Sequence, residues 1–262
     1  MLPVIGAVRP WADPQVVELG ARLPMHVPMA VECRRSLDGS WSFRLFDNPD
    51  AVPAGAVTGP TPEAHGRWRS MPVPSNWTVH DTGDLPHYTN VQMPFPGPPP
   101  ALPAHNPTGV YRRSFRVPRG WVPRDGRVVL HIGGAESVHA VYLNGDFVGY
   151  GTDSRLPSEY DVTAHLQPGD NHLAVVVIRY SAQSYVEDQD QWWHAGLHRP
   201  VYIEARPSVH VADVVCTAGL DLDTGAGTLR VAALVDFVKA PVRGYRVRVS
   251  VAGRRSVVDV PW

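Results

Sequence analysis

The sequence predicts an all-β protein made of two successive β-sandwiches. The chain has 262 residues, enough for one large domain and part of a second. Its 27 prolines and 23 glycines divide it into many short segments, which is typical of sandwiches and not of helical bundles. Asn144-Gly145 lies between two apolar runs and predicts a tight hairpin turn. We therefore expect antiparallel sheets joined by short turns.

The first domain is expected at residues 36–207. Within residues 36–46, Leu37, Trp41, Phe43 and Leu45 share one parity, the pattern of a half-buried strand. Residues 172–180 are apolar and largely β-branched, which predicts a central strand buried on both faces. Other strands of this domain are expected at residues 111–117, 127–132, 137–143, 147–150 and 201–205. Loops or irregular segments are expected at 47–70, 71–79, 151–161 and 181–199.

Residues 1–35 are expected to form an N-terminal arm, because they show little hydrophobic periodicity. Within the arm, residues 16–23 predict one short helical turn, since the preceding Asp13-Pro14 suits the start of a helix. We expect the arm to pack on the surface of the first domain or on a partner.

The strand pattern restarts after Pro207, so residues 208–262 are expected to begin a second, immunoglobulin-like sandwich. Its strands are expected at residues 209–217, 228–238 and 245–251, separated by turns rich in Gly, Asp and Pro. An immunoglobulin-like sandwich needs about seven strands. The segment therefore resembles the truncated beginning of such a domain, and whether the gene continues beyond Trp262 stays open.

Charge and cysteine content exclude several classes of partner. The 24 basic and 25 acidic residues nearly balance and form no basic stripe, so we expect no nucleic-acid or membrane partner. No apolar run reaches the ~18–20 residues of a spanning helix, and prolines interrupt the first residues, so no signal peptide is expected. Cys33 and Cys216 lie far apart without metal-ligand spacing. Two reduced cysteines are typical of a cytoplasmic protein.

One stretch, residues 181–199, concentrates acidic and aromatic side chains. Glu187, Asp188 and Asp190 are followed directly by Trp192 and Trp193. Carboxylates accept hydrogen bonds from sugar hydroxyls, and indole rings cover the apolar face of a pyranose. A solvated acidic loop beside two core tryptophans would show the same composition. Nothing around Glu187 and Asp190 predicts the frame of a glycosidic acid and nucleophile, so we interpret both as binding residues.

Several motifs in a fixed order resemble the N-terminal part of bacterial β-galactosidases of glycoside hydrolase family 2. Together they extend over about residues 10–207. They are RLPMH (22–26), SLDGSW (36–41), PSNW (74–77), YTNV (88–91), NPTG (106–109), VYLNG (141–145), GYG (149–151), DSRLPSEYD (153–161) and EDQDQW (187–192).

This resemblance implies a jelly-roll sugar-binding domain followed by the first immunoglobulin-like domain. The family hydrolyses terminal non-reducing β-D-galactose residues, such as that of lactose, by a retaining mechanism. Its catalytic acid/base and nucleophile lie in a later barrel domain. Whether this chain is itself an enzyme is therefore uncertain, and we expect it to be inactive alone. The siblings β-glucuronidase and β-mannosidase fit YTNV and EDQDQWW less well.

The resemblance also implies roles for three residues of the sugar pocket. Asp190 would contact galactosyl hydroxyls and a bound sodium ion, while Asn90 and Val91 would line the same pocket. Sodium binding should be weak without the barrel, which would supply further ligands. Magnesium is expected only in the catalytic domain, since Thr152 and Ala182 stand where some relatives have magnesium ligands.

Two other kinds of function stay open. The chain could be a free-standing carbohydrate-binding module, or an interaction fragment whose residues 1–35 support homo-oligomer contacts as in the family. The expected partners are a β-galactoside and the catalytic barrel. Asp153, Arg155, Glu159 and Asp161 of the DSRLPSEYD loop are expected to form a structural ion-pair network.

Overall fold

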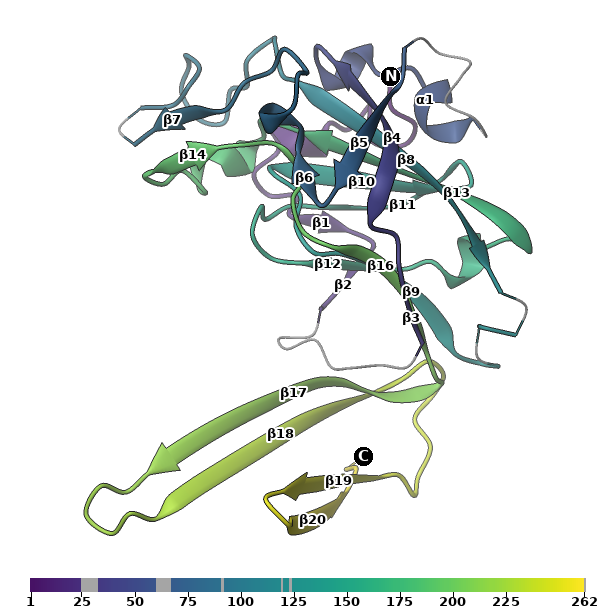
Figure 1. The fold of residues 1–262 in the computed structure, drawn as a ribbon, viewed down its shortest axis with the longest axis vertical. Helices are drawn as coiled ribbons and strands as arrows, with labels where there is room; N and C mark the ends of the chain where they lie inside the picture. The colour runs from purple at the N-terminus through teal and green to yellow at the C-terminus, as the bar shows by residue number, and fades with distance from the viewer. Residues whose placement is uncertain (25–32, 60–66, 91, 119, 123, 262) are drawn as a thin grey trace.

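The computed structural model describes residues 1–262 except 25–32, 60–66, 91, 119, 123 and 262. Two antiparallel sheets face each other and form a jelly-roll sandwich (Figure 1). The seven-stranded sheet has the order β1 (Glu18–Leu19), β11 (Asp146–Gly151), β10 (Val138–Leu143), β13 (Gly169–Ile178), β8 (Thr108–Val117), β4 (Gly39–Phe46) and β5 (Arg69–Val73). The five-stranded sheet has the order β2 (Ala21–Arg22), β12 (Ser158–Asp161), β9 (Arg127–Ile132), β16 (Val201–Arg206) and β3 (Arg34–Ser36).

Short elements connect the strands of the sandwich. Two-stranded ribbons pair β7 (His87–Thr89) with β14 (Gln191–Trp193) and β6 (Ser75–Asn76) with β15 (Gly196–Leu197). The helical pieces are η1 (Pro10–Ala12), η2 (Pro49–Ala51), α1 (Gly55–Thr58), η4 (Trp77–Val79), η5 (Thr163–His165) and η6 (Ala182–Tyr185). Over the described ranges, every helix is too short or too polar to cross a lipid bilayer.

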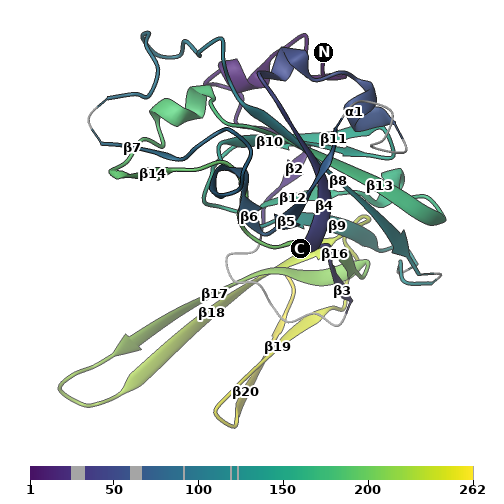
Figure 2. The ribbon, with the colours of Figure 1, turned by 45° about the horizontal axis from the view of Figure 1, so that its top comes forward.

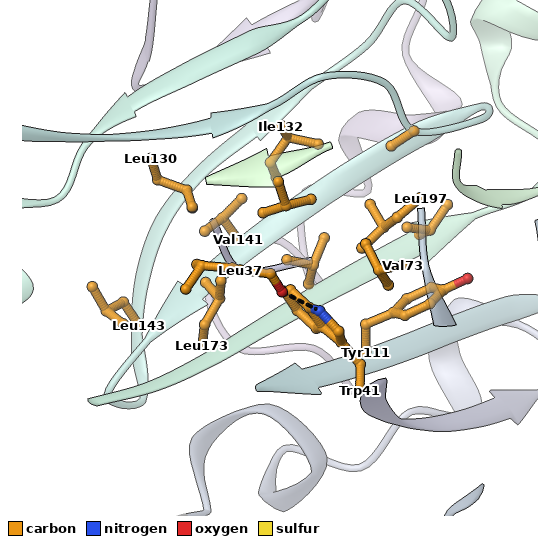
Figure 3. Packing of buried hydrophobic residues seen from close by; sticks show 14 of the residues in the cluster. Leu37, Trp41, Val73, Tyr111, Leu130, Ile132, Val141, Leu143, Leu173 and Leu197 are labelled. Atoms are coloured by element: carbon orange, nitrogen blue, oxygen red, sulfur yellow. Dashed lines mark hydrogen bonds between the residues drawn. The ribbon is translucent and has the colours of Figure 1, made fainter. Parts of the chain in front are cut away.

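The main core lies between the two sheets. Phe43 and Tyr111 contact each other with ring centroids 4.8 Å apart, and Trp77 lies 5.8 Å from Phe43. Trp41 also packs here, and its indole N–H donates to the Leu37 carbonyl at 2.8 Å (Figure 3). Burying one such aromatic side chain contributes roughly 1.5–3 kcal/mol, so these rings are a major source of stability.

The N-terminal residues cover the outer face of the seven-stranded sheet. Leu2, Ile5 and Trp11 are buried in a second apolar cluster with residues of β8, β10 and β13. The Tyr142 hydroxyl on β10 donates to the Pro3 carbonyl at 2.8 Å. The start of the segment expected as an arm therefore packs on this chain's own sheet.

The helical turn predicted at residues 16–23 is wrong, because two short strands occupy this segment. β1 pairs with β11 in one sheet, and β2 pairs with β12 in the other. Gly20 between them has φ +68°, and a Cβ there would lie 2.8 Å from the Val148 carbonyl oxygen. The glycine lets the chain pass from one sheet to the other, which a helical turn would prevent.

Most strands of the first domain lie where the sequence predicts them. β13 is central, paired with β10 on one side and β8 on the other. Asn144 and Gly145 have φ of 55° and 93°, the left-handed values that the predicted hairpin turn requires. Two strands of the main sheets, β5 and β12, fell in segments expected to be irregular, as did the short ribbon strands β6, β14 and β15. β5 contains Pro72, which an edge strand tolerates, and β12 carries the buried polar residues Ser158 and Glu159.

Beyond the sandwich, the chain forms two antiparallel hairpins (Figures 1 and 2). The first pairs β17 (Val209–Leu220) with β18 (Gly227–Phe237), and the second pairs β19 (Arg246–Val251) with β20 (Arg254–Asp259). The three strands predicted here are confirmed, and β20 is an additional one. Asp236 on β18 contacts Arg22 at 2.7 Å and Arg127 at 3.4 Å, which links the first hairpin to the five-stranded sheet. Both cysteines are free and exposed.

Candidate functional site

The two motifs of the expected sugar pocket meet in the β7–β14 ribbon. Thr89 pairs with Gln191, Tyr88 with Trp192 and His87 with Trp193. Asn90 follows Thr89 and Asp190 precedes Gln191, so both lie at the same end of the ribbon. The ribbon projects from one side of the sandwich (Figures 1 and 2). Two segments that lie about 100 residues apart in the sequence thus form one structure.

One face of the ribbon combines polar and aromatic groups. The Tyr88 hydroxyl donates a short hydrogen bond to Asp190 Oδ1, and this bond raises the pKa of Tyr88. Tyr88 is 50% exposed and Trp192 is 58% exposed, with ring centroids 5.9 Å apart. An exposed carboxylate, an exposed amide at Asn90 and two aromatic faces are the groups that bind sugars in proteins.

The opposite face of the ribbon is an anchor. Trp193 is 7% exposed and forms a small apolar cluster with Phe95 and Tyr180. Its ring stacks on His87 with centroids 5.7 Å apart. The adjacent tryptophans therefore have different roles, because successive residues of a strand point to opposite faces. Trp193 holds the ribbon on the sandwich, and Trp192 is available to a ligand.

Glu187 does not share the open face with Asp190. Its carboxylate accepts hydrogen bonds from the backbone N–H of Ser154, at 3.0 Å, and from the Ser154 hydroxyl. Burial raises the pKa of Glu187, and the bonds from Ser154 partly offset this effect. Glu187 thus fixes the neighbouring loop, which is a structural role in place of the binding role expected for it.

Of the four residues of the DSRLPSEYD segment expected in an ion-pair network, Arg155, Glu159 and Asp161 form ion pairs, whereas Asp153 accepts backbone hydrogen bonds. Arg155 Nη1 lies 2.9 Å from Glu136 Oε2, and Glu159 Oε1 lies 2.8 Å from Arg206 Nη2. Despite its burial, the pKa of Glu159 is lowered by His131 and Arg206. Asp153 Oδ1 accepts from the backbone N–H of Arg155 at 2.9 Å. These contacts are all internal to the protein, so they stabilise the loop that joins β11 to β12.

The expected metal ligands were compared with the described residues. Among them, no group of three or more His, Cys, Asp or Glu side chains is placed to hold a metal ion. Asp190 offers one hard carboxylate oxygen for sodium, close to the amide of Asn90. The Thr152 hydroxyl donates to the Val17 carbonyl at 2.9 Å, and Ala182 is buried, so both serve packing. The sodium and magnesium expectations stay predictions.

The three residues implied by the resemblance have different outcomes. Asn90 and Asp190 are exposed and lie together at the ribbon's end, although this position does not by itself test their role. Val91 lies outside the described residues. The contact of Tyr88 with Asp190 was not predicted, and the sequence did not distinguish Trp192 from Trp193. Strand alternation within residues 191–193 would have separated the two tryptophans.

Two β-galactosidases are similar to this chain in sequence over most of its length. A β-galactosidase of Psychromonas ingrahamii is 38% identical over 235 residues, which cover 85% of this chain and 22% of that protein. A β-galactosidase of Yersinia pestis is 38% identical over 248 residues, covering 90% of this chain and 23% of that protein. The chain thus spans less than a quarter of the length of these relatives.

Solved structures share the fold at lower identity. A β-glucuronidase of an uncultured Clostridium aligns with a TM-score of 0.59 at 23% identity, covering 82% of this chain and 36% of that one. A β-glucuronidase of Bifidobacterium dentium aligns with a TM-score of 0.56 at 26% identity, covering 76% and 34%.

The model of the sugar-binding domain of family 2 glycosyl hydrolases matches residues 34–207, the region that forms most of the sandwich and all of the β7–β14 ribbon. The chain therefore belongs to glycoside hydrolase family 2, of which it contains the N-terminal sugar-binding domain.

Proposed function

We propose that this chain forms one edge of the galactose pocket of a β-galactosidase. The complete protein would hydrolyse terminal β-D-galactosides by a retaining mechanism, with its acid/base and nucleophile supplied by a catalytic barrel. Support comes from the relatives named β-galactosidase, which are 38% identical, compared with 23% and 26% for the β-glucuronidases. Because the chain matches 22% of the relatives' length, hydrolysis is proposed for the complete protein and not for this chain alone.

One observation carries the proposal, the meeting of Asn90 and Asp190 at the end of the β7–β14 ribbon. The Asp190 carboxylate would accept hydrogen bonds from ring hydroxyls, and the Asn90 amide would both donate and accept. Tyr88 fixes Asp190 Oδ1 through its hydroxyl, which leaves Oδ2 for the sugar. The exposed Trp192 ring would cover an apolar face of the ligand. The chain thus would orient the sugar beside the catalytic groups.

A sodium ion would fit as an auxiliary ligand of the same site. Asp190 would hold it, and the bound ion would supply a positive charge that orders a sugar hydroxyl. We expect weak sodium binding by this chain because other oxygen ligands would come from the barrel. Magnesium is proposed only for the catalytic domain.

An NMR titration of the chain with methyl β-D-galactoside tests the proposal. We expect weak binding, at millimolar or higher concentration, with shifts confined to the ribbon and abolished by Asp190→Asn. The matched glucuronide should bind less well than the galactoside, because its carboxylate would face the charge of Asp190. Shifts centred elsewhere, or unchanged in Asp190→Asn, would rule out this pocket edge.

A free-standing carbohydrate-binding module is the second candidate. The exposed pair of Tyr88 and Trp192 favours it, since such rings bind sugars without help from other domains. Calorimetry separates the two functions. A module should bind galactose unaided at micromolar to low-millimolar dissociation constants, whereas a pocket edge should bind more weakly.

The proposal also includes a cytoplasmic location and homo-oligomer contacts through residues 1–35. The two free, exposed cysteines suit a reducing compartment. Leu2, Ile5 and Trp11 are used within the chain, so the contacts to another copy would involve the exposed Met1, Val4 and Val8. Mixing the chain with an N-terminally truncated β-galactosidase and recovering activity would support such contacts.

A further inference from the structure

A buried arginine lies beneath the β7–β14 ribbon. Arg179 directly follows β13 and is only 3% exposed. Its Nη1 pairs with Asp84 Oδ1, while Nη2 donates to the Leu85 carbonyl at 3.0 Å and to His87 Nδ1 at 2.8 Å. A buried guanidinium is costly unless it is paired and hydrogen-bonded. Here one side chain contacts three residues in and just before the start of β7.

The arginine is itself fixed to the rigid core. Asp84 Oδ2 accepts a hydrogen bond from the Trp77 indole at 2.7 Å. Trp77 is fully buried and packs in the core between the sheets. The backbone N–H of Arg179 donates to the Pro107 carbonyl at 3.0 Å, which holds the arginine at the end of the central strand. Its guanidinium therefore occupies a position set by the sandwich.

Arg179 also contacts the ribbon through His87. His87 is the first residue of β7, and its ring stacks on Trp193 of β14. Burial lowers the pKa of His87, and the charge of Arg179 lowers it further, so the neutral ring presents Nδ1 as an acceptor. Tyr88 follows on the opposite face and bonds to Asp190. Contacts on the face that carries His87 and Trp193 thus determine the position of the face that carries Tyr88.

We propose that Arg179 is a positioning residue, which holds β7 so that Tyr88 and Asn90 lie opposite Asp190. It acts through His87 and Asp84 and does not touch the sugar. The role of this position in ligand binding rests on the proposed galactose site. The ordering of the ribbon by Arg179 does not depend on that function, and it can be measured separately.

The test is Arg179→Lys in the full chain, followed by amide hydrogen exchange. A lysine keeps the charge but lacks the planar fork that reaches Asp84, Leu85 and His87 together. We expect the amides of β7 and β14 to exchange at least about tenfold faster, with those of β8 and β13 unchanged. Arg116→Lys is the matched control. Arg116 is exposed, pairs with Asp170 at the other end of β13, and should leave the ribbon unaffected.

A second variant keeps the test decisive if Arg179→Lys fails to fold. His87→Phe keeps a ring to stack on Trp193 but removes the Nδ1 acceptor, so it should also loosen the ribbon. Wild-type exchange in β7 and β14 of either folded variant would overturn the proposal. In the galactoside titration, both variants should bind about tenfold more weakly. A wild-type chain that binds no galactoside would overturn the proposed pocket, while the exchange data would still decide the role of Arg179.

Discussion

The sandwich and the C-terminal hairpins have similar local sequences but very different burial. Every residue of β9 and β10 is buried, and most of these residues are apolar. β20 is exposed at every residue although Val257 and Val258 have the same β-branched character. In the described residues, every buried apolar cluster lies outside residues 208–262.

Strand propensity therefore determines where a hairpin forms, but not whether the hairpin has a core. A sheet stabilises a domain when a second layer covers its apolar face. The seven-stranded sheet is covered on both faces. The five-stranded sheet packs on one face, and the N-terminal residues pack on the other. The hairpins pair their backbone groups but leave Leu220, Leu222 and Leu234 exposed. Their stability should therefore depend on few side chains.

The same substitution in the two regions should give the largest contrast. Leu130 on β9 is 1% exposed, and Leu229 on β18 is 47% exposed. Leu130→Ala should lower the free energy of unfolding by about 2–5 kcal/mol, because it removes buried methyl groups and leaves a cavity. Leu229→Ala should change it by less than about 0.5 kcal/mol. Urea unfolding followed by tryptophan fluorescence measures both.

Equal losses of stability at Leu130 and Leu229 would show that the hairpin is as well packed as the sandwich. A large cost at Leu229 would mean that the hairpin face is covered in solution, for example by a second copy of the chain. Repeating the unfolding at several protein concentrations distinguishes that case, because a covered interface makes stability depend on concentration.

Acidification should destabilise the sandwich through a buried histidine. His139 on β10 is 2% exposed, and burial lowers its pKa to about 4. The unfolded chain takes up a proton near pH 6.5, whereas the folded chain resists it down to about pH 4. Stability should therefore fall as pH falls through this window, by about 3 kcal/mol in total. Urea unfolding at a series of pH values measures the slope.

Substituting His139 tests whether this residue causes the pH dependence of the free energy of unfolding. His139→Gln cannot be protonated and should flatten the pH dependence between pH 6.5 and 4. Part of the slope should persist, since burial also lowers the pKa of His198 to about 4. An unchanged slope in His139→Gln would show that the folded protein already protonates this histidine.

The sequence was most informative where local pattern and tertiary contact agree. β9 occupies the six residues predicted for it, and β13 is central because its residues 173–178 are apolar throughout. β12 was missed because Ser158 and Glu159 are polar yet buried, and Glu159 is acceptable there only through Arg206 and His131. Such pairing depends on strands far apart in sequence, so no local pattern predicts it.

The site was predictable only in part for the same reason. Tyr88 and Asp190 are 102 positions apart, and each strand of their ribbon has three residues. Strands this short carry little periodicity. Only the family resemblance predicted that Asn90 and Asp190 lie in the same pocket. The anchoring contacts of Arg179 and Trp193 follow from the packing, which the sequence alone does not determine.

A smaller effect is expected at the link between the sandwich and the first hairpin. Asp236 on β18 faces Arg22 at 2.7 Å, Arg127 at 3.4 Å and His210 at 3.7 Å. Asp236→Asn should weaken the attachment of the first hairpin by about 1 kcal/mol, because Arg127 is largely buried and would lose an anionic partner. Faster amide exchange in β17 and β18, with β9 unchanged, would show this.

Lys239→Gln provides the matched control for that link. Lys239 lies 2.6 Å from Asp125, but both side chains are more than half exposed, so solvent screens the pair. We expect no measurable change in exchange from this variant. Equal effects of Asp236→Asn and Lys239→Gln on amide exchange would mean that the buried and the exposed ion pair stabilise the hairpin equally. A larger effect of Asp236→Asn would show that one partly buried carboxylate joins a region with a core to one without.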